Sequence, residues 1–101
     1  MANAGSRTDA RFLILTSLSS GAKHGYAMVT DIEQFAGVHV GPGTLYTALQ
    51  RLETDGLIKA VASDDRRRPY RITPAGLTAL RTDTEEMRRV ARVAGQRLAL
   101  R

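Results

Sequence analysis

The stretch GPGTLYTALQRLETDG, residues 41–56, contains both ends of one helix. Pro42 suits a first helical turn, because the N–H that proline lacks would have no partner inside the helix. Three leucines then recur on one face at spacings of four and three: Leu45, Leu49 and Leu52. Gly56 follows, and glycine tolerates the positive φ at which many helices end. The stretch therefore predicts a helix from Pro42 to just before Gly56.

Two helices are expected before this one. The first covers residues 8–19, and five apolar residues form its buried stripe: Phe12, Leu13, Ile14, Leu15 and Leu18. The second covers residues 25–36 and ends at Gly37, with an apolar residue at every third position: Tyr26, Val29, Ile32 and Phe35. Asp31 and Glu33 are expected on its wet side. About five residues join the second helix to the third, a short connection typical of a helix-turn-helix.

A short β-hairpin is predicted after the third helix. Its strands cover residues 57–62 and 69–72, and residues 63–68 form a charged tip. Two acids and five cations lie between residues 59 and 71, and the cations are Lys59, Arg66, Arg67, Arg68 and Arg71. A helix-turn-helix followed by a basic hairpin is the outline of a winged helix, in which the third helix enters the major groove and the hairpin touches the backbone or the minor groove.

Thr73 and Pro74 open a last helix that runs to the end of the chain. Its best register is a heptad seam of Leu77, Leu80, Thr84, Met87, Ala91, Ala94 and Leu98. Residues 82–85 match a capping box, so two helices are the alternative to one. The predicted fold is mostly α with a small β-hairpin. It comprises a flexible arm (residues 1–7), a winged helix-turn-helix domain (8–73) and a C-terminal dimerisation helix (74–101).

Composition narrows the possible functions. With 101 residues and 43% apolar content, the chain is long enough for one domain, and its net charge of +5 favours an anionic partner. The chain lacks cysteine, and we find no metal-ligand spacing, catalytic triad, carboxylate pair or phosphate loop. We therefore expect no enzyme activity, metal or cofactor. The apolar run of residues 12–15 is too short for a signal peptide or membrane helix, which predicts a cytoplasmic protein.

The expected partner is double-stranded DNA, approached by small polar groups on the third helix and by the basic hairpin. The outward positions of that helix are Gly43, Thr44, Thr47 and Gln50, with Tyr46 beside them. These side chains suit close approach to base edges, while Arg66, Arg67 and Arg68 suit phosphates. Alternatively, the three arginines form a solvated turn, Tyr46 is a core ring, and Thr44 merely starts the helix. Arg71 either reaches DNA or pairs with Asp64 or Asp65. We interpret His24 as a capping or packing residue and assign no role to His39.

Four motifs in this order resemble the PadR family of bacterial transcriptional regulators, over about residues 12–80. They are KHGY at residues 23–26, GPGTLY at 41–46, LQRLETDGLI at 49–58 and YRITPAG at 70–76. The resemblance implies a winged helix dimer, usually a repressor, of the compact subgroup with a single C-terminal helix. Many members release DNA when a small, often aromatic, effector binds. The resemblance places Pro42 at the opening of the recognition helix, and Thr47 departs from the family pattern, which makes it a candidate for sequence preference.

A second copy of the chain is the expected cover for the last helix. Met87, Val90 and Val93 would be exposed in a monomer, and a partner would bury them together with Phe12. The dimer would also carry two DNA-binding helices, which matches a pseudo-palindromic site. A small hydrophobic or aromatic effector would sit in this seam, whose wall residues are otherwise plain dimer core: Phe12, Met87, Val90 and Ala94. Asp83, Glu85 and Glu86 are expected to pair with arginines of the partner helix. A winged helix that binds protein or RNA is the alternative function.

Overall fold

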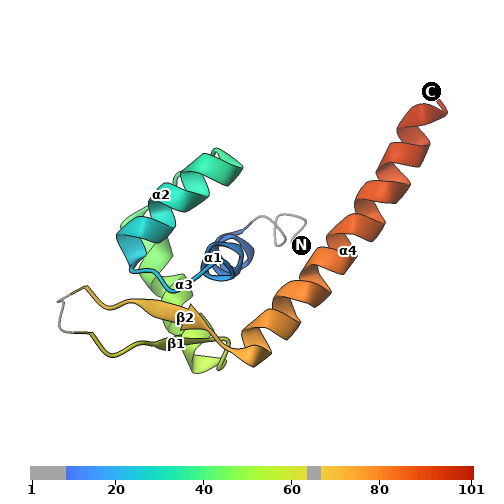
Figure 1. The fold of residues 1–101 in the computed structure, drawn as a ribbon. Coiled ribbons are helices and arrows are strands. Elements are labelled where there is room, and N and C mark those ends of the chain that lie inside the picture. Colours follow the sequence, from blue (N-terminus) through green and yellow to red (C-terminus); the bar gives the residue numbers. More distant parts are fainter. Residues whose placement is uncertain (1–8, 64–66) are drawn as a thin grey trace.

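The computed structural model describes residues 9–63 and 67–101, and it confirms the predicted fold class (Figure 1). The elements in order are α1 (Ala10–Leu18), α2 (Gly25–Ala36), α3 (Pro42–Thr54), β1 (Ile58–Ala60), β2 (Tyr70–Ile72) and α4 (Pro74–Ala99). The first three helices and the hairpin form one body, and α4 projects away from it. The predicted arm of residues 1–7 and the tip residues Asp64, Asp65 and Arg66 lie outside the described residues.

Helix ends follow the predicted cap and glycine signals closely. Gly37 and Gly56 have φ of 68° and 76°, the left-handed conformation that ends α2 and α3. The first helix begins at Ala10 rather than at residue 8, because the Asp9 carboxylate accepts the N–H of Phe12 and Asp9 is therefore the N-cap. His24 caps α2 in the same way by accepting the N–H of Ala27, as interpreted from the sequence.

The core lies where α1, α2 and α3 meet under β1. Its buried apolar residues are Leu13, Ile14, Leu15, Leu18, Met28, Ile32, Val40, Leu45, Leu49, Leu52 and Ile58. The three leucines predicted for α3 are all buried, as expected. Phe12 is only half-buried, at the edge of the stripe that the sequence predicts for α1.

The predicted buried face of α2 is wrong at both of its ends. Tyr26 is 75% exposed and Phe35 is 46% exposed, whereas Met28 and Ile32 are buried. Each step of three residues falls short of a full turn, so three steps rotate the face by about half a turn. Residues at i and i+4 stay closer to one face, which is why Met28 pairs with Ile32.

Asp31 is also misplaced by the sequence analysis, which puts it on the wet side of α2. It is half-buried, and its carboxylate accepts a 2.8 Å hydrogen bond from the hydroxyl of Ser17, a fully buried residue of α1. The hydrogen bond explains how a hydroxyl and a carboxylate fit between two packed helices. Glu33 is exposed, as predicted.

The hairpin is antiparallel, with Ile58 opposite Ile72 and Lys59 opposite Arg71. Its strands are shorter than predicted, because the N–H of Leu57 bonds back to the carbonyl of Leu52 in α3, and Pro69 has no N–H to donate. We call the hairpin, residues 57–72, the wing. Two backbone hydrogen bonds between Lys23 and Tyr70, of 2.9 and 3.1 Å, connect the wing to the turn before α2.

The last helix is continuous over its 26 residues, so the alternative of two helices is wrong. Residues 82–85, which match a capping box, lie inside this helix and do not start a new one. Side chains pack on the body only up to residue 87, and all later ones are exposed. Within the chain, Asp83 pairs with Arg11 and Glu85 with Arg88, while pairing of these acids with a partner's arginines stays a prediction.

No helix within residues 9–63 and 67–101 combines the length and the apolar character needed to cross a membrane.

Candidate nucleic-acid interface

The outward side of α3 is fixed by its three buried leucines. At 100° per residue, the side opposite to them is that of Gly43, Thr47 and Gln50, and all three are exposed. We call these three residues the reading face. Thr44 and Tyr46 lie on its two flanks, and Tyr46 is 63% exposed. The structure thus brings the predicted α3 residues together on one accessible surface, with Pro42 exposed at its start.

A hollow of about 400 Å³ lies on the Tyr46 side of α3, and we call it the wing groove. It is formed by the start of α2, by α3 and by the wing, and is lined by His24, Gly25, Tyr26, Tyr46, Leu49, Arg67, Arg68 and Tyr70. Among the described residues, no acceptor takes the N–H groups of Gly25 and Tyr26 in the first turn of α2. Free N–H groups, tyrosine hydroxyls and two guanidinium groups are together suited to an anionic backbone.

A larger hollow of about 840 Å³ lies on the Thr44 side of α3, and we call it the α1 groove. Its lining residues come from the start of α1 and from α3: Asp9, Ala10, Arg11, Gly43, Thr44, Thr47, Ala48, Arg51, Leu52 and Asp55. Two acids and two arginines balance here, whereas the wing groove has no acid. The charge on the two sides of the reading face is therefore unequal.

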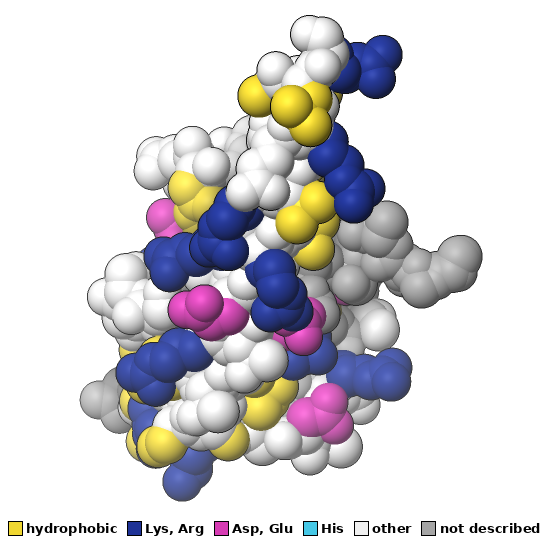
Figure 2. All heavy atoms as spheres, turned by 90° about the vertical axis from the view of Figure 1, so that its right-hand side faces the viewer, with side chains coloured by type: hydrophobic (Ala, Val, Ile, Leu, Met, Phe, Trp, Pro, Cys, Tyr) yellow, Lys and Arg dark blue, Asp and Glu magenta, His cyan; other side chains and the backbone are white. Residues whose placement is uncertain are grey.

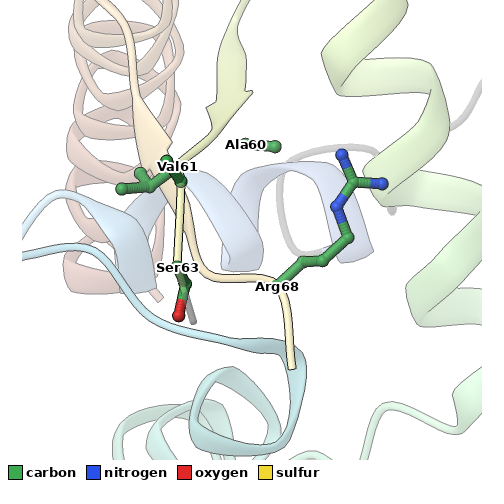
Figure 3. Close-up of a pocket in the computed structure, with 5 residues that line it drawn as sticks. Ala60, Val61, Ser63 and Arg68 are labelled. Carbon is green, nitrogen blue, oxygen red and sulfur yellow. The ribbon is translucent and has the colours of Figure 1, made fainter. Parts of the chain in front are cut away.

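The described part of the wing is strongly cationic. Its charged residues are Lys59, Arg67, Arg68 and Arg71, and residues 59–63 and 67–71 include no acid. A further hollow of about 360 Å³ runs along the wing beside Ala60, Val61, Ala62, Ser63 and Arg68 (Figure 3). In that view Arg68 extends away from Ser63, with its guanidinium near Ala60. Arg66 and the proposed partners of Arg71, Asp64 and Asp65, lie outside the described residues.

The residues predicted for the dimer seam differ in exposure. Phe12 and Met87 are half-buried, while Val90 is 66% exposed and Ala94 is exposed. Figure 2 shows the outer side of α4, where Lys and Arg side chains alternate with apolar ones. In the part of the chain that is described, no group of three or more acidic, histidine or cysteine side chains could hold a metal ion.

Sequence reasoning missed three residues that line the grooves. Tyr26 was expected in the core, although a helical rotation counted from Ile32 would have placed it outside. Arg11 and Arg51 carried no sequence signal, because only the packing of α1 against α3 makes them neighbours of the reading face. His39, which had no expected role, pairs with the carboxylate of Glu33.

Comparisons with known proteins agree on one family. Residues 14–82 match the family model described as the transcriptional regulator PadR-like family. Transcriptional regulator Rv3488 of Mycobacterium tuberculosis is 38% identical over 89 residues, which cover 85% of this chain and 82% of the relative. A PadR family transcription regulator from Clostridium difficile R20291 has a solved structure with a TM-score of 0.80 and 28% identity, covering 88% of this chain and 97% of that one.

A further relative is much longer than this chain. It is an uncharacterized 37.1 kDa protein in transposon TN4556 of Streptomyces fradiae, 42% identical over 83 residues. The match covers 82% of this chain and 24% of that protein, so the chain spans about a quarter of its length.

Proposed function

The chain belongs to the PadR-like family of transcriptional regulators, which bind DNA and are not enzymes, and we propose that it is a sequence-specific repressor. In this proposal a homodimer binds a pseudo-palindromic operator, with α3 in each major groove and the wing on the phosphate backbone. The observation that carries the proposal is the uncharged reading face of α3 beside the cationic wing groove.

The reading face supplies groups that distinguish bases. Gln50 can bond in bidentate fashion to adenine, and the methyl group of Thr47 can pack on thymine. Gly43 adds no side chain at the start of α3, so the backbone can approach the DNA closely. Thr44 and Tyr46 are proposed to contact phosphates or base edges from the flanks, and Pro42 to present the helix start. Specificity is thus assigned to α3.

The wing groove is proposed to hold the phosphate backbone. Arg67 and Arg68 contribute charge from the wing, and Tyr26 and Tyr46 contribute hydroxyl groups from two helices. Arg66 is assigned the same role from its place in the sequence. Such contacts set the register of the protein on DNA and carry no sequence information themselves.

Replacing Thr47 or Gln50 with alanine is expected to change which operator sequence is preferred. Discrimination at one base pair of each half-site should fall by about 1–3 kcal/mol, while binding to non-specific DNA stays the same. Titrations against duplexes that carry every single base substitution measure this effect. Gln34→Ala, on the exposed side of α2, is the matched control. A Gln50 variant that weakens binding equally at every position would contradict the assignment.

Dimerisation is proposed through α4. The exposed apolar side chains Val90 and Val93 follow the point at which α4 leaves the body, and a second copy would cover them. We divide the chain accordingly, into a DNA-binding domain up to residue 73 and a dimerisation helix from residue 74. A small hydrophobic or aromatic effector is assigned to the same seam, whose walls would be Phe12, Met87, Val90 and Ala94.

Val90→Glu is expected to convert the homodimer into a monomer, because it buries an unpaired carboxylate in the seam. Sedimentation velocity measures the change, and operator affinity should fall with it by about tenfold or more, since one half-site contact is lost. Ala99→Glu adds the same charge nine residues after Val90, which is the opposite side of α4, and should leave the dimer intact. A Val90→Glu protein that remains dimeric at micromolar concentration would rule out this seam.

A further inference from the structure

Two residues of α4 are buried against the body, and they lie two helical turns apart. The first is Gly76, which packs directly on the wing at Leu57, just before β1, and at Ile72 in β2. The second is Asp83. These are the only buried residues of α4, and they are about 10 Å apart along the helix axis. Ala79 and Leu80 lie between them and are partly buried against the core. A contact at Asp83, far along this packed segment, limits the direction in which the helix leaves the body.

The second point is electrostatic. Asp83 is only 7% exposed, and the guanidinium of Arg11 lies 3.7 Å from its carboxylate. A carboxylate at this depth is costly unless cations or hydrogen-bond donors compensate it. Arg11 belongs to α1, so the ion pair joins the helix that leaves the body to the helix at its centre.

Arg11 also lies beside the DNA-reading helix. It lines the α1 groove together with Thr44, Thr47 and Arg51 of α3. The ion pair is therefore placed between α4 and the reading face. Beyond residue 87 the helix continues for about 18 Å without support from the body. With Gly76 as the pivot, a 1 Å shift at Asp83 moves the end of the helix by about 3 Å.

We propose that Arg11 and Asp83 are positioning residues whose ion pair fixes the direction of α4 relative to α3. In the homodimer proposed above, on which this last step rests, the direction of α4 sets the distance between the two reading faces. The pair then determines which half-site spacing the dimer accepts, although neither residue is required to touch a base.

Spin labels can measure the direction of α4 in the full chain. The chain has no cysteine, so Thr54→Cys and Gln96→Cys place one label at the end of α3 and one near the end of α4. Dilution with unlabelled protein confines the pulsed-EPR signal to distances within one chain. The wild-type background should show one narrow distance distribution. Asp83→Asn and Arg11→Gln should each broaden it at least twofold, with helicity by circular dichroism unchanged.

The matched control is Glu85→Gln, which breaks the exposed ion pair with Arg88 on the same helix and should leave the distribution narrow. Arg11 is half-exposed, so Arg11→Gln decides the question even where Asp83→Asn fails to fold. A distribution that stays narrow in Arg11→Gln and in every folded Asp83 variant would overturn the proposal.

A second sample tests the proposed homodimer independently of the role of the ion pair. With Thr54→Cys alone and no dilution, the label reports the distance between the two copies of α3. A narrow peak in wild type that broadens in Arg11→Gln supports both proposals. The absence of any distance between copies would contradict the homodimer, while the measurement within one chain would still decide the role of the ion pair.

Discussion

Replacing Arg67 and Arg68 together with alanine is expected to weaken DNA binding by a factor on the order of 10²–10³ at about 0.15 M salt. The homodimer then loses two cations from each wing groove. Because each lost phosphate contact lowers the salt slope by about 0.9, the slope should become shallower by about 3 to 4. The loss should be the same for operator and non-specific duplexes, since phosphates carry no sequence. Fluorescence anisotropy at several salt concentrations measures both quantities.

A matched variant tests whether the position of these charges, or only their number, determines the affinity for DNA. Arg89 and Arg92 are exposed on α4, away from the wing, and their replacement with alanine changes the net charge equally. Affinity should fall less than about fivefold in that variant, because distant exposed charges are screened. Equal losses in both variants would show that net charge, rather than the wing, attracts DNA.

Gly76→Ala is expected to destabilise the fold by about 3 kcal/mol, the range of an overpacked core plus a broken hydrogen bond. A Cβ at this position would lie 2.1 Å from the carbonyl oxygen of Leu57 and 2.6 Å from the side chain of Ile72. The Leu57 carbonyl also accepts the N–H of Thr73, so it cannot move without loss of that bond. Thermal unfolding should show a melting temperature lower by about 10–20 °C.

Gly95→Ala is the matched control in the same helix, and it is expected to stabilise the protein. No atom of the chain lies within 4 Å of a Cβ built at Gly95. Alanine there should stabilise the helix by about 0.5–1 kcal/mol, the usual gain over glycine. A Gly76→Ala protein that melts at or above the wild-type temperature would contradict the close packing of α4 on the wing.

The fold was predictable because its boundaries depend on local chemistry. Pro42 marks the start of α3, because proline has a fixed φ and no N–H to satisfy. Gly56 and Gly37 mark the ends of α3 and α2, because glycine tolerates a positive φ. The spacing of the three leucines in α3 then determines its buried side, and the reading face is the side opposite to them. The wing could be predicted from its charge and its Pro69.

What the sequence did not reveal depends on contacts between elements. Tyr26 and Phe35 matched a three-residue repeat, but that repeat drifts around the helix, and the body of the protein covers only its middle. Asp31 is a polar residue that the pattern assigns to the surface, yet it is half-buried, and its carboxylate accepts the hydrogen bond of the buried Ser17 hydroxyl. Arg11 lies 72 positions before Asp83, and no local pattern links them.

Sequence-specific binding by the reading face is the central step of the proposed function, and one titration measures it. The purified chain would be titrated by fluorescence anisotropy against the DNA upstream of its own gene, with excess non-specific duplex, at several salt concentrations. We predict tight binding that the competitor does not abolish, with a steep salt slope and loss of preference in the Gln50→Ala variant. Weak binding that the competitor abolishes, on this DNA and on any duplex selected from a random pool, would contradict a sequence-specific regulator.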